Sequence, residues 1–338
     1  MQQYTSPGLV DSRPSFVFTP QTSSVGSPVP LLVMLHGCGQ TATDFAVGTA
    51  MNVLAEAYSF IVVYPQQTNR YNLHSCWNWF DPAHQVRECG EPASIAGIVQ
   101  SMQQDTVHWT IDPRRIYVAG LSAGAAMAVV LGTTYPDLFA AVGVHSGLEY
   151  QAATTLERAL KAMRRGGPDP FQQGNVAYAA MKHFARVVPL IVFHGTHDTT
   201  VTPINGDQTV QQWMYTDQLA AHGSYTSDFH HPDTVQEEQH PSMLSASVFT
   251  WKGDGGRDVQ SYWKVNGLGH AWSGGSPGGS FTDPRGPNAS REMVRFFLDH
   301  PMEGVERHPF SAWKSLRRLM TEVLHVKRAD RLPGGAYR

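Results

Sequence analysis

Short apolar runs recur along most of the chain, and segments with helical spacing lie between them. The runs are continuous rather than alternating, which is typical of parallel strands that are covered on both faces. They fall at residues 29–37, 60–65, 115–120, 140–147 and 189–195. The helical patterns fall near residues 43–58, 93–109, 122–134, 207–222 and 288–300. This alternation predicts right-handed βαβ crossovers and an α/β fold, with a doubly wound, mostly parallel sheet and helices on both faces.

The remaining segments have other patterns. Residues 245–265 carry two alternating aromatic stretches around an Asp-Gly-Gly turn, which predicts a β-hairpin. Residues 66–92, 150–188 and 223–246 have weak periodicity and are expected to be loops. Long loops at the carboxyl ends of strands usually build the binding site of such a sheet. We therefore expect residues 66–92, which are rich in Trp and His, to line the site; the alternative is a plain surface connection.

Composition limits the class of protein. The 338 residues are 41% hydrophobic and 16% charged, which is enough apolar content for one large domain, expected at residues 1–300. The formal net charge of -3 gives no reason to expect nucleic-acid binding. No run of about 18 apolar residues predicts a membrane span, and the first residues lack a signal-peptide pattern. The compartment stays open: cytoplasmic, or extracellular or periplasmic if a leader was removed.

The last segment, residues 301–338, differs from the rest. It places apolar residues at helical spacing and basic residues between them, which predicts a basic amphipathic helix. Such a helix either docks on the main domain or meets an anionic surface or a protein partner, which the sequence does not identify.

A serine lies between two glycines where a predicted strand becomes a predicted helix: Gly120, Ser122 and Gly124. G-x-S-x-G in this context is typical of a nucleophile elbow, which exposes the serine hydroxyl at the top of the sheet. Glycines suit the two flanking positions because side chains there would collide with the neighbouring strand and helix. The alternative is a tight structural turn without chemistry.

Serine needs a base to take its proton, and chain order suggests which histidine does so. In α/β-hydrolases the acid and then the histidine follow the serine. Asp198 comes just after the apolar run 189–195, and His270 lies in a glycine-bracketed loop after the hairpin. Asp198 could instead cap a turn, His270 could be an ordinary loop residue, and His194, His197 and Asp198 could bind a metal. We favour the triad because these positions converge on one edge of the sheet.

A serine hydrolase also needs two N–H donors for the oxyanion. The residue after the nucleophile, Ala123, should supply one. The second should come from the loop after the first central strand, where His36 and Gly37 turn the chain and direct the N–H of Cys38 toward the site.

The chain has three cysteines, Cys38, Cys76 and Cys89, and no CxxC pair that would indicate zinc. They predict either three buried thiols or one disulfide with a free thiol, which would point to an oxidising compartment.

Four stretches together resemble the poly(3-hydroxybutyrate) depolymerase-type esterases of the α/β-hydrolase fold, relatives of feruloyl and acetyl-xylan esterases. They are residues 31–46, 76–99, 112–147 and 267–297. The resemblance implies serine-esterase activity, with Ser122 as nucleophile, Asp198 as acid, His270 as base and Cys38 as the second oxyanion donor.

The same resemblance makes residues 76–80 a wall of the cleft, with Trp77 and Trp79 facing acyl groups; the alternative is that either ring faces the core. It also implies a bond between Cys38 and Cys76. Secreted polymer-degrading members usually carry a leader, a linker and a separate polymer-binding domain, and none is visible here. This departure favours soluble esters or oligomers over crystalline polyester.

The sequence therefore predicts a serine esterase that needs no metal and no organic cofactor. Its expected substrate is a polyhydroxyalkanoate-type polyester or its oligomers. Feruloyl or acetyl esters of plant polysaccharides are the alternative, and a non-catalytic binding protein that keeps the fold is a third hypothesis.

Overall fold

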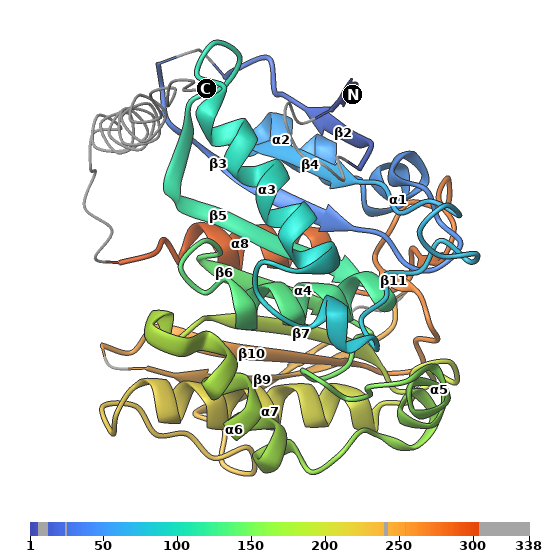
Figure 1. The fold of residues 1–338 in the computed structure, drawn as a ribbon. Helices are drawn as coiled ribbons and strands as arrows, with labels where there is room; N and C mark the ends of the chain where they lie inside the picture. The colour runs from blue at the N-terminus through green and yellow to red at the C-terminus, as the bar shows by residue number, and fades with distance from the viewer. Residues whose placement is uncertain (6–12, 24–25, 240–242, 254, 304–338) are drawn as a thin grey trace, which may run out of the picture. The chain divides into compact units, whose positions relative to one another are not determined.

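Ten strands of the computed structural model form one sheet, in the order β1-β2-β4-β3-β5-β6-β7-β10-β9-β8 (Figure 1). Each pair of neighbours from β4 to β10 is parallel, and the two outer strands at each end run antiparallel to their neighbours. The strands are β1 (Gln2–Tyr4), β2 (Ser15–Phe18), β3 (Val29–Leu35), β4 (Ile61–Pro65), β5 (Ile111–Leu121), β6 (Ala141–His145), β7 (Leu190–Gly195), β8 (Thr234–Glu238), β9 (Ala246–Lys252) and β10 (Asp258–Val265). The structure describes residues 1–5, 13–23, 26–239, 243–253 and 255–303.

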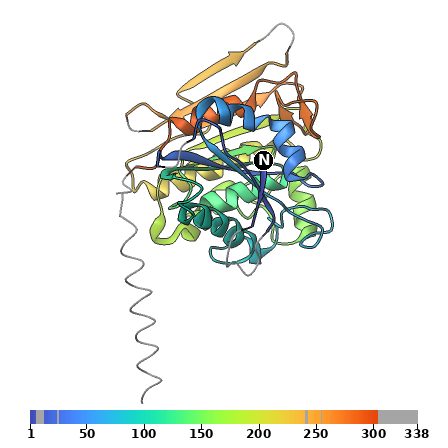
Figure 2. The same ribbon diagram turned by 90° about the horizontal axis from the view of Figure 1, so that it is seen from above.

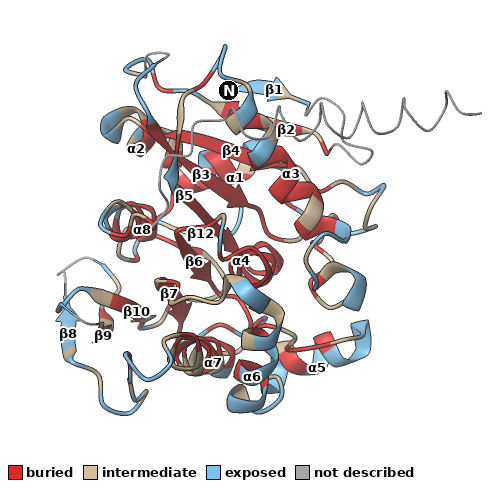
Figure 3. Ribbon diagram, turned by 60° about the vertical axis from the view of Figure 1, so that its left-hand side comes forward, coloured by how far each residue is buried: buried red, intermediate tan, exposed pale blue. Residues whose placement is uncertain are grey.

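Helices cover both faces of this sheet (Figure 2). They are α1 (Ala42–Thr49), α2 (Met51–Tyr58), α3 (Gly90–Gln104), α4 (Ala123–Thr134), α5 (Leu156–Arg165), α6 (Pro170–Met181), α7 (Ile204–Ala220) and α8 (Ala289–Leu298). Leu31 and Val33 of β3 lie in one core with residues of α3 to α7, whereas Leu32 and Met34 lie in a second core with residues of α1, α2 and α8. The central strands are therefore buried on both sides (Figure 3), which explains their continuous apolar runs.

The predicted α/β architecture is confirmed, and all five apolar runs are strands. The helix expected at residues 43–58 is in fact two helices, because Ala50 adopts a left-handed conformation (φ 51°) between α1 and α2. Residues 150–188, expected to be a loop, contain α5 and α6. The buried residues of α5 are the small Ala159 and Ala162, so no large apolar residues mark its inner face.

The predicted hairpin is confirmed as β9 and β10, and β8 pairs with β9 inside the segment expected to be a loop. Among residues 66–92 the regular structure is the short helix η1 (Pro82–His84) and the first residues of α3. Two short pieces, β11 (Trp272–Ser273) and β12 (Thr282–Asp283), pair beyond the hairpin, and η2 (Lys182–Phe184) follows α6.

The described residues up to 302 form one compact unit. The predicted tail helix lies outside the described residues from position 304 onward and stays a prediction. Among the described helices, none combines the length and apolar character needed to cross a membrane.

Candidate active site

Ser122 occupies a sharp turn between β5 and α4. Its backbone has φ 57° and ψ -118°, an uncommon conformation for a residue that is not glycine. The Ser122 N–H donates to the carbonyl of His145 at the end of β6 (2.9 Å), and the Ser122 carbonyl accepts from Ala126 N–H in α4 (2.9 Å). Strained backbone held by bonds on both sides is typical of functional sites.

The two flanking glycines have a steric cause. A Cβ at Gly120 would overlap the backbone of Gly124, and a Cβ at Gly124 would overlap the carbonyl oxygen of Leu35 in β3. The helix therefore starts in direct backbone contact with two strands. Any larger residue would push Ser122 away from its position.

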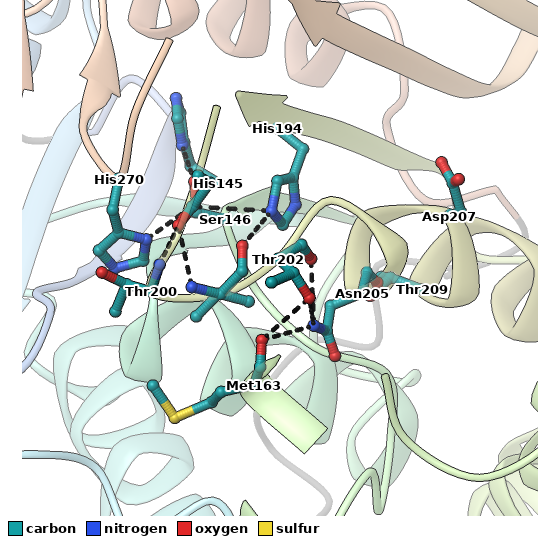
Figure 4. A network of polar contacts seen from close by, with 12 residues as sticks. His145, Ser146, Met163, His194, Thr200, Thr202, Asn205, Asp207, Thr209 and His270 are labelled. Carbon is teal, nitrogen blue, oxygen red and sulfur yellow. Dashed lines mark hydrogen bonds and ion pairs between the residues drawn. The ribbon is translucent and has the colours of Figure 1, made fainter. Parts of the chain in front are cut away.

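Asp198 and His270 meet at the same edge of the sheet. His270 Nδ1 donates to Asp198 Oδ2 over 2.7 Å, although 72 positions separate the two residues. The other carboxylate oxygen, Asp198 Oδ1, accepts from the N–H groups of Thr200 and Val201, each at 2.9 Å. Figure 4 shows His270, Thr200 and His194 gathered in this network. The bond at Nδ1 leaves Nε2 as the proton acceptor of a neutral His270.

The carboxyl group of Asp198 is buried yet charged. Burial by itself would raise its pKa, but the hydrogen bond from His270 and the nearby imidazoles of His270 and His194 outweigh burial, and the pKa of Asp198 is lowered. Asp198 thus carries the negative charge that can offset a protonated His270.

His145 is a site residue that the sequence analysis missed. Its Nε2 accepts from the N–H of Ser273 (3.0 Å), and its ring stacks between Phe193 and Trp272. Burial and the neighbouring imidazoles of His194 and His270 lower the pKa of His145 well below its usual value, so it stays neutral. Through its bond to Ser273, His145 links β6, the strand beside the elbow, to the segment that follows His270. In the sequence, its position at the carboxyl end of the apolar run 140–147 was the feature that could have indicated it.

The turn after β3 lies against the elbow. A Cβ at Gly37 would come within 3.6 Å of Ser122 Cβ. The turn is held by Gly37 N–H donating to Gln40 Oε1 (2.9 Å) and by the bond between Cys38 and Cys76. Within the described part of the chain, the N–H groups of Cys38 and Ala123 have no hydrogen-bond acceptor. Both are thus available to a ligand, as an oxyanion hole requires.

Trp77 and Trp79 lie in the core. Trp77 has no exposed surface and donates from Nε1 to the carbonyl of His36 (3.0 Å), while Trp79 is 5% exposed. The burial of both rings favours the alternative, in which they face the core. Trp77 instead supports the turn after β3, which a short C-W-N-W motif does not reveal.

The cysteines follow the disulfide alternative. Cys38 bonds to Cys76, as the resemblance implied, and Cys89 is a free, exposed thiol. The prediction of three buried thiols is wrong.

The metal alternative has little structural support. Nε2 of His194 donates to the carbonyl of Val201 (2.8 Å) and lies 3.7 Å from Asp198 Oδ2. Among the described residues, no group of three or more His, Cys, Asp or Glu side chains is placed to hold a metal ion.

A sequence model of the family described as "Esterase PHB depolymerase" matches residues 16–229. The chain belongs to this family. Its relatives include poly(3-hydroxyalkanoate) depolymerase C of Paucimonas lemoignei, 37% identical over 211 residues, which cover 62% of this chain and 49% of that protein. Feruloyl esterase B of Neurospora crassa is 29% identical over 222 residues, 63% of this chain and 73% of that protein. The chain thus spans about half the length of the Paucimonas depolymerase that it matches.

Solved structures agree on the fold of this family member. The acetyl xylan esterase from Aspergillus awamori superposes with a TM-score of 0.67 at 22% identity, covering 88% of this chain and 98% of that chain. At this identity the likeness shows the fold alone: the protein has the α/β-hydrolase fold, as the sequence predicted.

Proposed function

We propose that this protein hydrolyses carboxylic esters with Ser122, His270 and Asp198 as its catalytic triad. The observation that carries the proposal is the 2.7 Å bond from His270 Nδ1 to Asp198 Oδ2. It stands at the edge of the sheet where the strained elbow presents Ser122. Membership of the esterase family supports the same chemistry.

The proposed reaction has two steps. Ser122 Oγ attacks the ester carbonyl while His270 Nε2 takes its proton, and Asp198 holds the imidazole in the required tautomer. The N–H groups of Ala123 and Cys38 stabilise the oxyanion of the tetrahedral intermediate. The alcohol leaves with a proton from His270, and water then releases the acid from Ser122 by the same path.

The proposed substrate is a polyhydroxyalkanoate-type polyester or its oligomers. The Paucimonas depolymerase has the higher identity of the two relatives compared above and supports this choice. A feruloyl or acetyl-xylan ester is the second candidate, supported by the fungal feruloyl esterase and by the acetyl xylan esterase fold.

The triad is tested by Ser122→Ala. The variant should fold normally and lose roughly a thousandfold or more in kcat on a short p-nitrophenyl ester, together with labelling by a fluorophosphonate probe. Ser101→Ala, in α3, serves as the control and should keep both. Unchanged turnover in Ser122→Ala would contradict the proposal, and absence of labelling in the natural protein would favour a non-catalytic binding role.

The substrate class is tested on the purified protein with hydroxybutyrate oligomers, methyl ferulate and acetylated xylan. The first proposal expects the highest kcat/KM on the oligomers. A higher value on either plant ester would replace it with the second candidate.

A further inference from the structure

Phe281 is an exposed aromatic residue beside the proposed base. Half of its surface is accessible, and its ring packs edge-on against His270, with ring centroids 6.5 Å apart and planes at 77°. Most other exposed large hydrophobic side chains lie on helices, whereas Phe281 contacts the imidazole that is proposed to transfer the proton. An exposed ring at this point has an apolar face available to a ligand.

The backbone at Phe281 is strained. Its φ is 51°, in the left-handed region that bulky residues avoid. Its carbonyl accepts from the N–H of Trp272 (2.7 Å), two residues after His270. The strained residue is thus tied directly to the segment that carries the base. Strain of this kind persists only where the surroundings enforce it.

A polar clamp enforces the conformation, and we define it as Gln40, Asp44 and Ser280. Asp44 accepts from both the backbone N–H (3.0 Å) and the hydroxyl of Ser280. Gln40, 2% exposed, donates from Nε2 to the Ser280 carbonyl and to Asp44 Oδ2, each at 3.0 Å. The residue immediately before Phe281 is therefore fixed by two partners, with Asp44 bonded at its N–H and hydroxyl and Gln40 bonded at its carbonyl.

The same clamp reaches the oxyanion turn. Oε1 of Gln40 accepts from Gly37 N–H (2.9 Å), next to the proposed donor Cys38. These bonds therefore fix the position of Phe281 relative to both His270 and the oxyanion turn. A side chain fixed in this way is suited to contact a substrate at a defined distance from the reacting carbonyl.

We propose that Phe281 determines specificity by packing against the alcohol portion of the ester. The inference rests on the proposed function: His270 passes its proton to the leaving oxygen, so the alcohol must lie beside this imidazole. A ring that touches His270 is then within reach of the alcohol's carbon chain. The proposed oxyanion donors, Cys38 and Ala123, lie at the turn after β3 and at the start of α4.

The experiment compares methyl, butyl and hexyl acetate, which share one acyl group and hence one deacylation step. Acid release is followed by titration at constant pH in the full chain. Phe281→Ala should lower kcat/KM for hexyl acetate by about tenfold and for methyl acetate by less than about twofold. Phe281→Tyr, which keeps the ring, should retain the natural preference. Phe171→Ala is the matched control, since Phe171 is 53% exposed but lies on α6.

Three results would overturn the assignment: an unchanged ratio of hexyl to methyl acetate, an equal loss on all esters, or a loss that follows acyl length in methyl butanoate and hexanoate. If Phe281→Ala does not fold, Phe281→Leu carries the comparison, with a smaller loss expected. A natural protein without Ser122-dependent hydrolysis would remove the proposed function and this assignment together. An active protein that is insensitive at position 281 removes the assignment alone.

Discussion

Two strained turns flank the candidate site, and they are supported by different forces. Ser122 (φ 57°) and Phe281 (φ 51°) both adopt a left-handed backbone without being glycine. At Ser122, the turn depends on close backbone packing that a side chain at Gly120 or Gly124 would block. At Phe281, hydrogen bonds from the clamp hold the preceding residue.

The two turns also differ in how far along the chain their supporting residues lie. The glycines of the elbow lie within two positions of Ser122, so a local motif records the turn. Asp44 and Ser280 are 236 positions apart, and Gln40 and Ser280 are 240 apart. A turn that steric contacts enforce can therefore be predicted from a few consecutive residues of the sequence. A turn that is held by hydrogen bonds from residues distant in the sequence cannot.

The largest effect is expected where the elbow is most crowded, at Gly124. Gly124→Ala places a methyl group on the Leu35 carbonyl, so the start of α4 must shift. We expect a loss of about 3 kcal/mol in the free energy of unfolding and at least about a hundredfold fall in kcat/KM. Urea unfolding and ester assays measure both.

Gly269→Ala is the stability control, because a Cβ there meets nothing within 4 Å. It should leave the urea midpoint nearly unchanged. Equal stability of Gly124→Ala and the natural protein would show that the elbow is not sterically enforced.

A smaller effect is expected at the clamp. Asp44→Ala removes the acceptor of two bonds from Ser280 and should cost about 1–2 kcal/mol of unfolding free energy, with roughly tenfold lower kcat/KM. Asp44→Asn, which keeps one carbonyl acceptor, should lose less. Glu157→Ala removes an acid from the first turn of α5 and should change little.

A double mutant can separate the effect of the clamp from that of the strained backbone at position 281. Phe281→Gly relieves the left-handed conformation, so the stability loss of Asp44→Ala should shrink in that background. An undiminished loss in the double mutant would mean that the clamp does not hold position 281.

The last effect concerns stability alone and involves a buried carboxyl outside the two strained turns. Glu149 follows β6, is 3% exposed, and neither of its oxygens has a hydrogen-bond partner among the described residues. Burial, with a contribution from the charge of Asp169, raises the pKa of Glu149 to about 9. The folded protein thus keeps this proton up to about pH 9, whereas the unfolded chain releases it near pH 4.5.

Stability should therefore be lost as pH rises through this window, because the unfolded state sheds the proton first. Glu149→Gln carries no proton to lose and should be more stable than the natural protein by about 1–3 kcal/mol at pH 8. The advantage should shrink toward pH 4, as measured by urea unfolding at both pH values. Glu157→Gln, an exposed control, should show no such trend; a pH-independent gain at Glu149 would contradict the raised pKa.

The sequence alone determined the α/β fold class, the five central strands and the convergence of Asp198 with His270. These follow from local periodicity and from chain order, since strands of a parallel sheet end at one edge. It also placed Ser122 between glycines whose purpose is steric.

Only the tertiary structure decided which aromatic rings face outward. Trp77 and Trp79 are buried and Phe281 is exposed beside His270, although all three are aromatic residues in polar loops. It likewise decided the break at Ala50, the position of His145 and the clamp on Ser280. The physical reason is that burial and hydrogen bonding depend on which distant segments meet, and no local pattern along the chain specifies those partners.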